Sequence, residues 1–345
     1  MNRFSTGLRW ESAPPSSRSC DRPGDQRRSK LHVDIHQHVW PGALAEELRR
    51  RAQPPRLDGW TLLTSGEPPF EVNPADHDIT LRAAQAAHDG VGRVVIGLSS
   101  PLGIEYLRPE DAVPLLDAYH DGIAGLGAPF GGWAAACLTD IDAAGLAKQL
   151  DRGFLGLQLP ATAVADEPGY QWCSPLLDVL ADRDLPLFIH PGPAPATAAG
   201  ATAAGAAWWA ALVPYVQQLH AAWFAFRAFA RPAYPRLRVC FTALAGLGPL
   251  HGERLAARGG ADPLARGRVD PRMFVETSSY GNRAVDGVLR VLGVDMLVFG
   301  SDRPYAEPRP DFGLGEAARH AIRAVNPARL LHGDQVRFDC PPGEE

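Results

Sequence analysis

Two histidines separated by one residue, His36 and His38, end an apolar run in the segment "LHVDIHQHVWPG" at residues 31–42. Side chains two positions apart on a β-strand point to the same face, so the two imidazoles are predicted to lie side by side. Val33 and Ile35 are then predicted to face the other way and pack outward. Two adjacent imidazoles can chelate one metal ion. Alone the pair is a weak signal, because such histidines are more often core or surface residues.

Two other apolar runs also end in a polar residue. The run "LPLFIHPG" ends in His190, and "MLVFGSDRP" ends in Asp302. Either residue alone can be structural, but their occurrence beside the His36 and His38 pair favours a shared site. Three imidazoles and one carboxylate form a donor set for Zn²⁺ or another divalent first-row ion, with a position left for water. The predicted metal ligands are therefore His36, His38, His190 and Asp302.

Eight apolar runs with β-type composition alternate with segments of helical periodicity. The predicted strands lie at 31–38, 92–98, 131–138, 153–159, 185–190, 237–244, 272–278 and 295–302, and the clearest helical segments at 76–90, 142–153, 174–184 and 282–293. This alternation predicts an α/β fold of parallel βαβ units, and eight strands favour a closed, TIM-like (β/α)₈ barrel. A doubly wound sheet would need a glycine-rich turn after its first strand, and "HQHVWPG" is not one. In such a barrel the carboxyl ends of all strands meet at one rim, where enzymes carry their chemistry.

The domain organisation is predicted to be simple. Residues 1–30, rich in Pro, Ser, Arg and Asp, are expected to form a disordered tail. A single barrel domain is predicted over 31–335, followed by a C-terminal tail at 336–345. Two insertions stand out, a Pro-rich excursion at 53–75 and a small-residue loop at 191–206. Each either covers and shapes a site or is a mobile surface insertion, and the sequence leaves both interpretations open.

Composition limits the possible partners. The formal charge is -5 and no stripe of Lys and Arg dominates, which argues against nucleic-acid binding and favours a small-molecule partner. No run of eighteen apolar residues is present, so no membrane span is predicted, and the first residues lack the apolar core of a secretory signal. The five cysteines form no CxxC pair, which is typical of a protein in a reducing cytoplasm. A cytoplasmic location is therefore predicted.

The segments "VDIHQH", "FIHPG", "FGSDRP" and "AVNPARLLHG" together resemble the amidohydrolase superfamily, specifically its amidohydrolase-related branch. That branch includes aminocarboxymuconate-semialdehyde decarboxylase, resorcylate-type decarboxylases and lactone hydrolases. The resemblance spans about residues 31–333. It implies a distorted (β/α)₈ barrel with one metal ion, in which His36 and His38 are first-strand ligands and His190 is the fifth-strand ligand. Asp302 matches the eighth-strand carboxylate that binds the metal and moves protons.

One position departs from the family pattern. The sixth strand usually ends in a histidine within an H-x-G-G stretch, whereas this chain reads "TALAG" and has Ala243 there. In the family decarboxylases that histidine handles a proton beside the metal, so its loss makes the decarboxylase interpretation less secure. His220 or His251 could supply a substitute, or both could be ordinary helix-surface residues. The following segment "GLGPLHGERL" resembles the family, and Arg254 matches an arginine commonly found there.

The predicted function is a metal-dependent hydrolase of a small cyclic amide, ester or lactone. In this reaction a metal ion, with Zn²⁺ as the predicted choice, activates a water molecule and Asp302 acts as the general base. An alternative is a metal-dependent decarboxylase of a small aromatic or unsaturated acid. A third interpretation, from another class, is a non-catalytic metal-binding scaffold, which the missing histidine favours and Asp302 disfavours. Related barrels often pair, so a homodimer is a further possibility.

Five residues are candidates for substrate contact, four at predicted strand ends and one, His251, at an apparent helix start. These are Trp40, His251, Tyr280, Arg303 and Tyr305. Arg303 could pair with an acidic substrate through two parallel hydrogen bonds. The other interpretation is that Arg303 is a solvated residue of the rim.

Overall fold

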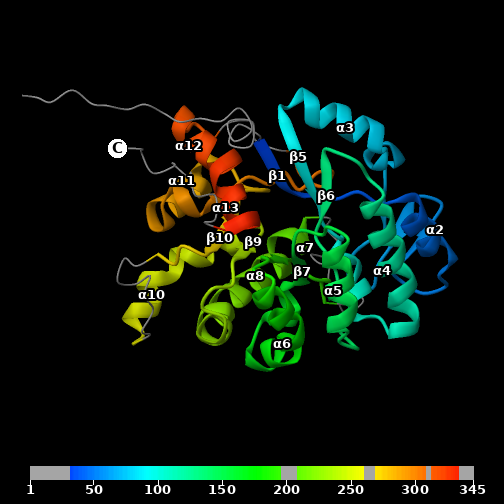
Figure 1. Ribbon diagram of the computed structural model, residues 1–345, viewed down its shortest axis with the longest axis horizontal. Coiled ribbons are helices and arrows are strands. Elements are labelled where there is room, and N and C mark those ends of the chain that lie inside the picture. The colour runs from blue at the N-terminus through cyan, green and yellow to red at the C-terminus, as the bar shows by residue number, and fades with distance from the viewer. Residues whose placement is uncertain (1–31, 196–207, 260–268, 308–311, 334–345) are drawn as a thin grey trace, which may run out of the picture.

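The computed structural model describes residues 32–195, 208–259, 269–307 and 312–333. Within these residues, eight parallel strands form a barrel, and Figure 1 shows strands at the centre of the protein. Each predicted apolar run contributes one strand. They are β1 (His32–Gln37), β5 (Val91–Ile96), β6 (Phe130–Gly132), β7 (Leu157–Pro160), β8 (Leu187–His190), β9 (Val239–Phe241), β10 (Met273–Glu276) and β11 (Leu297–Val298). The strands pair in parallel as β1-β5-β6 and as β11-β10-β9-β8-β7.

The two sheets join into a closed ring through two further links. Ala134, just after β6, forms a parallel bridge with Leu157 of β7. On the other side, the backbone N–H of Ile35 in β1 donates to the carbonyl of Phe299 after β11, at 3.1 Å. The strands therefore follow one another around the ring in chain order. The predicted α/β class and (β/α)₈ barrel are confirmed.

Helices surround the strands, and α2 and α4 lie side by side (Figure 1). The four helical segments predicted from periodicity appear as α3, α5, α6 and α11. The helices are α2 (Gly42–Arg50), α3 (Ile79–His88), α4 (Pro109–Ala124), α5 (Ala143–Asp151), α6 (Glu167–Asp182), α7 (Trp209–Leu212), α8 (Pro214–Ala225), α9 (Arg231–Ala233), α10 (Gly252–Ala257), α11 (Asn282–Leu292), α12 (Glu316–His320) and α13 (Asn326–His332). None of the described helices is long and apolar enough to cross a membrane.

The interior of the barrel is filled by one apolar cluster that draws on most of the strands. Its members are Val33, Ile35, Val95, Trp133, Phe188, Cys240, Phe274, Val298, Leu330 and Leu331. The prediction that Val33 and Ile35 pack outward is therefore wrong. The pairing of β1 with β5 shifts register between Asp34 and Gln37. Such an irregularity breaks the strict alternation of side chains along a strand. Ile35 therefore belongs to the same interior cluster as Phe188, and the ring of the next residue, His36, also contacts Phe188.

The Pro-rich excursion is an ordered small sheet. It contains three antiparallel strands, β2 (Arg56–Asp58), β3 (Thr61–Leu63) and β4 (Phe70–Glu71). Of the loop predicted at 191–206, the structure describes 191–195. The predicted tails at 1–30 and 336–345 lie outside the described residues and remain predictions.

A buried carboxyl group lies beneath the rim between β5 and β7. Glu105 is fully buried, Ser100 donates a hydrogen bond to its Oε1, and its Oε2 has no hydrogen-bond partner among the described residues. Ser100 also accepts a hydrogen bond from Gln158, at 2.8 Å. Burial raises the pKa of Glu105 from 4.5 to about 7, against the opposing effect of the Ser100 hydrogen bond.

The substitution Glu105→Gln should therefore stabilise the protein in a pH-dependent way. Between pH 4.5 and about 7 the unfolded chain loses this proton first, so the wild-type free energy of unfolding falls as pH rises. Above pH 7 this penalty amounts to roughly 3 kcal/mol, and the glutamine variant does not have it. Urea denaturation of both metal-free proteins at pH 4 and pH 8 measures the difference. An equal difference at both pH values would contradict the prediction.

Candidate metal centre

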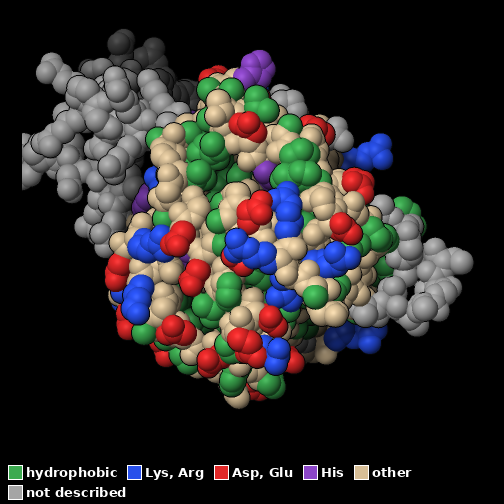
Figure 2. Space-filling model, turned by 90° about the vertical axis from the view of Figure 1, so that its right-hand side faces the viewer, with side chains coloured by type: hydrophobic (Ala, Val, Ile, Leu, Met, Phe, Trp, Pro, Cys, Tyr) green, Lys and Arg blue, Asp and Glu red, His purple; other side chains and the backbone are tan. Residues whose placement is uncertain are grey.

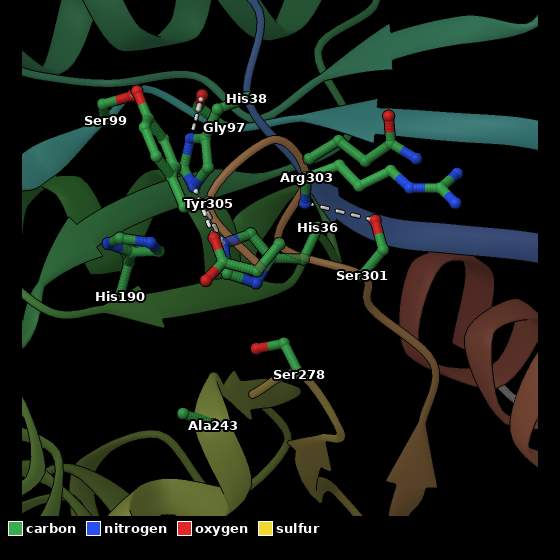
Figure 3. A network of polar contacts seen from close by, with 12 residues as sticks. His36, His38, Gly97, Ser99, His190, Ala243, Ser278, Ser301, Arg303 and Tyr305 are labelled. Atoms are coloured by element: carbon green, nitrogen blue, oxygen red, sulfur yellow. Dashed lines mark hydrogen bonds and ion pairs between the residues drawn. The ribbon is translucent and has the colours of Figure 1, made fainter. Parts of the chain in front are cut away.

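The four predicted metal ligands converge at the carboxyl end of the barrel. His36 lies in β1 and His38 follows it, His190 ends β8, and Asp302 follows β11. Each offers one ligand atom, and these atoms all lie within 4.8 Å of one another. Figure 3 shows the three imidazole rings pointing toward one another. Residues up to 266 positions apart in the chain are thus brought to one place by closure of the barrel.

Hydrogen bonds to the outer ring nitrogens orient the imidazoles. Nδ1 of His38 donates to the carbonyl of Gly97 at 3.0 Å, and Nδ1 of His190 donates to the carbonyl of Pro191 at 2.8 Å. A carbonyl can only accept, so each neutral ring carries its proton on Nδ1 and leaves Nε2 with a free lone pair. Nδ1 of His36 lies 3.1 Å from a carboxylate oxygen of Glu276 and has the same tautomer. The contacts therefore leave all three Nε2 atoms able to bind a metal ion.

The spacing of the ligand atoms fits a divalent cation. Nε2 of His36 lies 3.0 Å from Nε2 of His38, and Oδ1 of Asp302 lies 3.4 and 3.2 Å from these two atoms. Ligands ~2.1 Å from a tetrahedral ion are ~3.4 Å apart. Lone pairs this close repel one another unless a positive charge lies between them. Three imidazoles and a carboxylate are the donors that Zn²⁺, Mn²⁺ and similar ions accept.

The electrostatics of the cluster favour the metal-binding protonation state of Asp302 and His190. At His36, burial lowers the pKa but the charges of Asp302 and Glu276 outweigh it and raise the pKa above its ordinary value. Burial opposes ionisation of Asp302, but the imidazoles of His36, His38 and His190 outweigh it and lower the pKa of Asp302 to about 2. Burial, reinforced by His36 and His38, holds the pKa of His190 well below its ordinary value. At neutral pH the carboxylate is therefore ionised and the His190 imidazole is neutral.

Asp302 is the ligand that lies nearest the solvent. Its side chain is 20% exposed, whereas the side chains of His36 and His38 are 1% exposed. Its backbone is left-handed, with φ 58°, a conformation that aspartate tolerates better than most residues. Its N–H donates to the carbonyl of His36 at 2.8 Å, and its own carbonyl accepts from Tyr305 at 2.8 Å. These bonds hold the turn that presents the carboxylate to the mouth.

Glu276 is a further candidate site residue that the sequence did not reveal. It is fully buried at the end of β10, and its carboxylate accepts hydrogen bonds from His36 at 3.1 Å and from the Ser278 hydroxyl at 2.7 Å. The backbone N–H groups of Ser278 and Ala243 also donate to it. A carboxylate behind a ligand histidine fixes the ring and raises its basicity. The available signal was a lone acidic residue within the apolar run "MFVETS".

The substitution Glu276→Gln should weaken metal binding without removing a ligand. The amide keeps the shape but can present its NH₂ group to His36, so the ring loses a charged acceptor. Loss of such a partner typically costs about 10- to 100-fold in metal affinity. Competition with a fluorescent chelator measures the dissociation constant, with Glu253→Gln on the exposed surface of α10 as the control. Equal affinity in Glu276→Gln and wild type would contradict the assigned role.

Two of the predicted substrate residues lie at the mouth. The ring of Tyr305 lies 5.3 Å from the ring of His38, and its hydroxyl lies 3.4 Å from the Ser99 hydroxyl. Trp40 is buried behind this pair, because its indole N–H donates to Ser99 at 3.1 Å and its ring stacks on His77. Tyr305 therefore lies beside the ligand His38, and Trp40 is separated from Tyr305 by Ser99.

The other three candidates lie elsewhere. The side chain of Arg303 points away from the three imidazoles (Figure 3). Its guanidinium pairs with Asp89 at 2.5 Å, on the outer side of the barrel. His251 is exposed and contacts His220, with ring centroids 4.8 Å apart, and no described contact joins either ring to the ligands. Tyr280 lines a separate cavity of about 250 Å³ that also includes Ser278. Arg254, on α10, is exposed.

The position of the missing histidine is occupied by a short side chain. Ala243 begins an unusual left-handed turn, with positive φ at Ala243, Leu244, Ala245, Gly246 and Leu247. In Figure 3, Ala243 and Ser278 lie on the same side of the histidine cluster. A methyl group neither carries a proton nor accepts one.

A polar pair joins the Pro-rich excursion to α8. Tyr215, at the start of α8, donates a hydrogen bond to the carboxylate of Glu67 in the excursion. Phe70 of the same excursion lies 6.4 Å from the ring of Tyr305. Of the two interpretations left open for the excursion, this packing favours a segment that shapes the site. On the face in Figure 2, acidic and basic side chains are intermixed rather than gathered by sign.

No protein-family model and no curated protein sequence matches the chain. Solved structures do share its fold. A 5-carboxyvanillate decarboxylase from Sphingomonas paucimobilis matches with a TM-score of 0.67 at 18% identity, covering 88% of this chain and 99% of that one. IDCase from Metarhizium anisopliae matches with a TM-score of 0.71 at 17% identity, covering 87% and 97%.

Metal is present in some of these neighbours. A 5-carboxyvanillate decarboxylase from Novosphingobium aromaticivorans was solved with manganese and 4-hydroxy-3-methoxy-5-nitrobenzoic acid. It matches with a TM-score of 0.63 at 17% identity, covering 88% of this chain and 96% of that one. A 2,6-dihydroxybenzoate decarboxylase and an amidohydrolase II share the fold as well. The chain therefore shares a fold with decarboxylases and with an amidohydrolase II, as the sequence resemblance implied.

The neighbours also correct the predicted reaction. The sequence analysis placed a hydrolase first, but the similar structures are mainly decarboxylases, which fits the alternative better. The hydrolase prediction is wrong because it depended on motifs that both reactions share. The four ligands are common to hydrolases and decarboxylases of the resembled family, so they do not distinguish them. Ala243 alone does not exclude decarboxylation.

Proposed function

We propose that the protein is a metal-dependent decarboxylase of a small aromatic acid. The observation that carries the proposal is the convergence of His36, His38, His190 and Asp302 at the mouth of a barrel whose fold is that of known decarboxylases. These four residues would hold the ion. When bound, a divalent ion supplies positive charge that orients the acid's oxygens and stabilises electron density in the ring.

The chain's own residues would bind and orient the substrate. Asp302 is the ligand with the most exposed side chain that faces the mouth, so it would contact the substrate directly and exchange a proton with a hydroxyl group. Tyr305 provides an aromatic ring beside His38, on which a substrate ring would pack. The buried apolar cluster below the ligands closes the barrel and excludes water from beneath the site.

Turnover of aromatic acids tests the proposal. The purified protein, loaded with Mn²⁺ or Zn²⁺, would be incubated with 5-carboxyvanillate, 2,6-dihydroxybenzoate and related hydroxybenzoates while CO₂ and the decarboxylated phenol are measured. Metal-dependent release of CO₂ supports the proposal. Stoichiometric metal with no turnover across the panel would overturn it and favour the non-catalytic scaffold.

The finer predictions belong to the same proposal. Metal analysis of the protein as purified distinguishes Zn²⁺, which the sequence predicts, from Mn²⁺, with which neighbours from Novosphingobium and Polaromonas were solved. The small-molecule partner, the homodimer and the cytoplasmic location also remain predictions.

A further inference from the structure

A buried arginine of α3 contacts the two chain segments that carry His38 and Asp302. The guanidinium of Arg82 donates hydrogen bonds to the backbone carbonyls of His38 and Arg303, at 3.4 and 3.5 Å. Arg303 directly follows Asp302, and its carbonyl also accepts the N–H of His38 at 2.7 Å. Arg82 therefore holds the place where the segment after β1 meets the segment after β11.

The same guanidinium begins a second chain of polar contacts. It donates to Oε1 of Gln37, whose amide NH₂ group donates to Oδ2 of Asp34 at 2.7 Å. Oδ1 of Asp34 accepts the backbone N–H groups of His36, at 3.2 Å, and of Ser301, at 3.0 Å. His36 is a ligand, and Ser301 directly precedes Asp302. The two segments are thus joined a second time, again beside the ligands.

Arg82, Gln37 and Asp34 together form a buried cluster, the α3 network. Their exposed fractions are 4%, 3% and 1%. Burial lowers the pKa of Arg82, and the negative charge of Asp34 opposes this effect. A buried charge is costly unless its hydrogen bonds are made, and a fully bonded polar network favours one arrangement of the groups it joins. The network therefore fixes the backbone on both sides of it.

The network acts on the ligands through the backbone. The described hydrogen bonds of Arg82 go to backbone carbonyls and to Gln37, and none goes to the side chain of a ligand. In Figure 3, Ser301 and Arg303 lie on the side of the histidine cluster away from His190. Any effect of Arg82 on the site is therefore one of position and not of direct contact with an ion or substrate.

We propose that Arg82 is a positioning residue that holds Asp302 at the distance from His36 and His38 that a metal ion requires. Oδ1 of Asp302 lies 3.4 and 3.2 Å from Nε2 of these two rings. Metal–ligand distances tolerate changes of only about 0.2 Å. A small displacement of one segment against the other therefore weakens the site. The inference rests on the four-ligand centre of the proposed function.

The test is the affinity of folded Arg82 variants for Zn²⁺, measured by competition with a fluorescent chelator. Arg82→Met removes the donors and the charge, so the dissociation constant should rise by about 10- to 100-fold. Arg82→Lys keeps the charge but has one nitrogen in place of the planar fork, so it should recover only part of the affinity. The visible absorption of bound Co²⁺ reports the ligand geometry and should change in both variants.

Arg238→Met is the matched control. Arg238 is also buried, at 3% exposed, and donates to the carbonyl of Leu330 and to the carboxylate of Asp184, both at 2.8 Å. It directly precedes β9, so it lies at the amino end of the barrel, away from the ligands. Either substitution breaks a buried network and should lower Tm. Only Arg82→Met should lose Zn²⁺ affinity and change the Co²⁺ spectrum.

A double-mutant cycle tests the route through Gln37. Because Arg82→Met and Gln37→Leu break the same network, the double variant should lose less Zn²⁺ affinity than the product of the two single losses. Losses that multiply in full would show that the two residues act independently, which contradicts the proposed network.

The remaining outcomes separate the inference from the proposed function. Arg82→Met with wild-type Zn²⁺ affinity and Co²⁺ spectrum, or with losses that Arg238→Met matches, would overturn the inference and leave the proposed function intact. If Arg82→Met fails to fold, Arg82→Lys decides, and wild-type affinity in that variant counts against the inference. A wild type that binds Zn²⁺ but releases no CO₂ from any acid overturns only the proposed function, since metal affinity still decides the role of Arg82. A wild type that binds neither Zn²⁺ nor Mn²⁺ overturns both.

Discussion

The substitution Asp302→Asn is expected to lower kcat for decarboxylation by about 10³-fold. Asparagine keeps the size of the side chain but removes the one negative charge among the four ligands. It also removes the carboxylate that faces the substrate, since this side chain is 20% exposed while His36 and His38 lie buried beneath it. The loss should therefore appear in turnover more than in folding.

Steady-state kinetics with metal analysis of the same sample measures this effect. Asp286→Asn, on the exposed side of α11, is the matched control and should match the wild type. An Asp302→Asn variant that holds metal and turns over at the wild-type rate would show that Asp302 has no part in the chemistry.

The substitution His190→Ala is expected to leave the purified protein without its metal ion. Apparent binding free energies of four-ligand sites are about 10–16 kcal/mol, so one ligand contributes roughly 3–4 kcal/mol, or about 10²- to 10³-fold in affinity. His190 is buried and held by Pro191, so no solvent-exposed side chain replaces it without rearrangement. After dialysis against a weak chelator, the variant should contain little metal and release no CO₂.

The control for this experiment is His88→Ala. His88 ends α3, is exposed and lies outside the ligand cluster. Both variants remove one imidazole, so a loss of metal in His190→Ala alone assigns the effect to the site. Equal metal content in the two variants would remove His190 from the ligand set.

Much of the fold was predictable because apolar runs and helical periodicity report burial directly. Each of the eight runs contains or overlaps a barrel strand. The meeting of His190 and Asp302 with the paired histidines was predictable for a related reason. Parallel strands in a closed barrel end at one rim, so a polar residue at the end of a buried strand is placed there by topology alone.

Orientation within the rim was not predictable. Alternation along β1 fails at a shift of register, which turns Ile35 inward beside His36. Arg303 follows Asp302 directly, but the left-handed backbone at Asp302 precedes a turn that sends the guanidinium outward to Asp89. Neither feature can be predicted from the residues of the segment itself, because both depend on contacts with other strands and helices.

A residue from a distant segment was missed for the same physical reason. In the sequence, Glu276 is a single acidic residue in an apolar strand. Only the tertiary structure shows that its carboxylate contacts the ring of His36. The reaction class was missed because hydrolases and decarboxylases share the ligand motifs.

Anomalous diffraction from crystals grown with Mn²⁺ or Zn²⁺ tests the central claim most directly, because it locates the ion itself. The predicted result is one peak per chain at the carboxyl end of the barrel, in contact with Nε2 of His36, His38 and His190 and with the Asp302 carboxylate. A map with no peak there, or with the ion bound elsewhere and Asp302 or His190 turned away from His36 and His38, would contradict it.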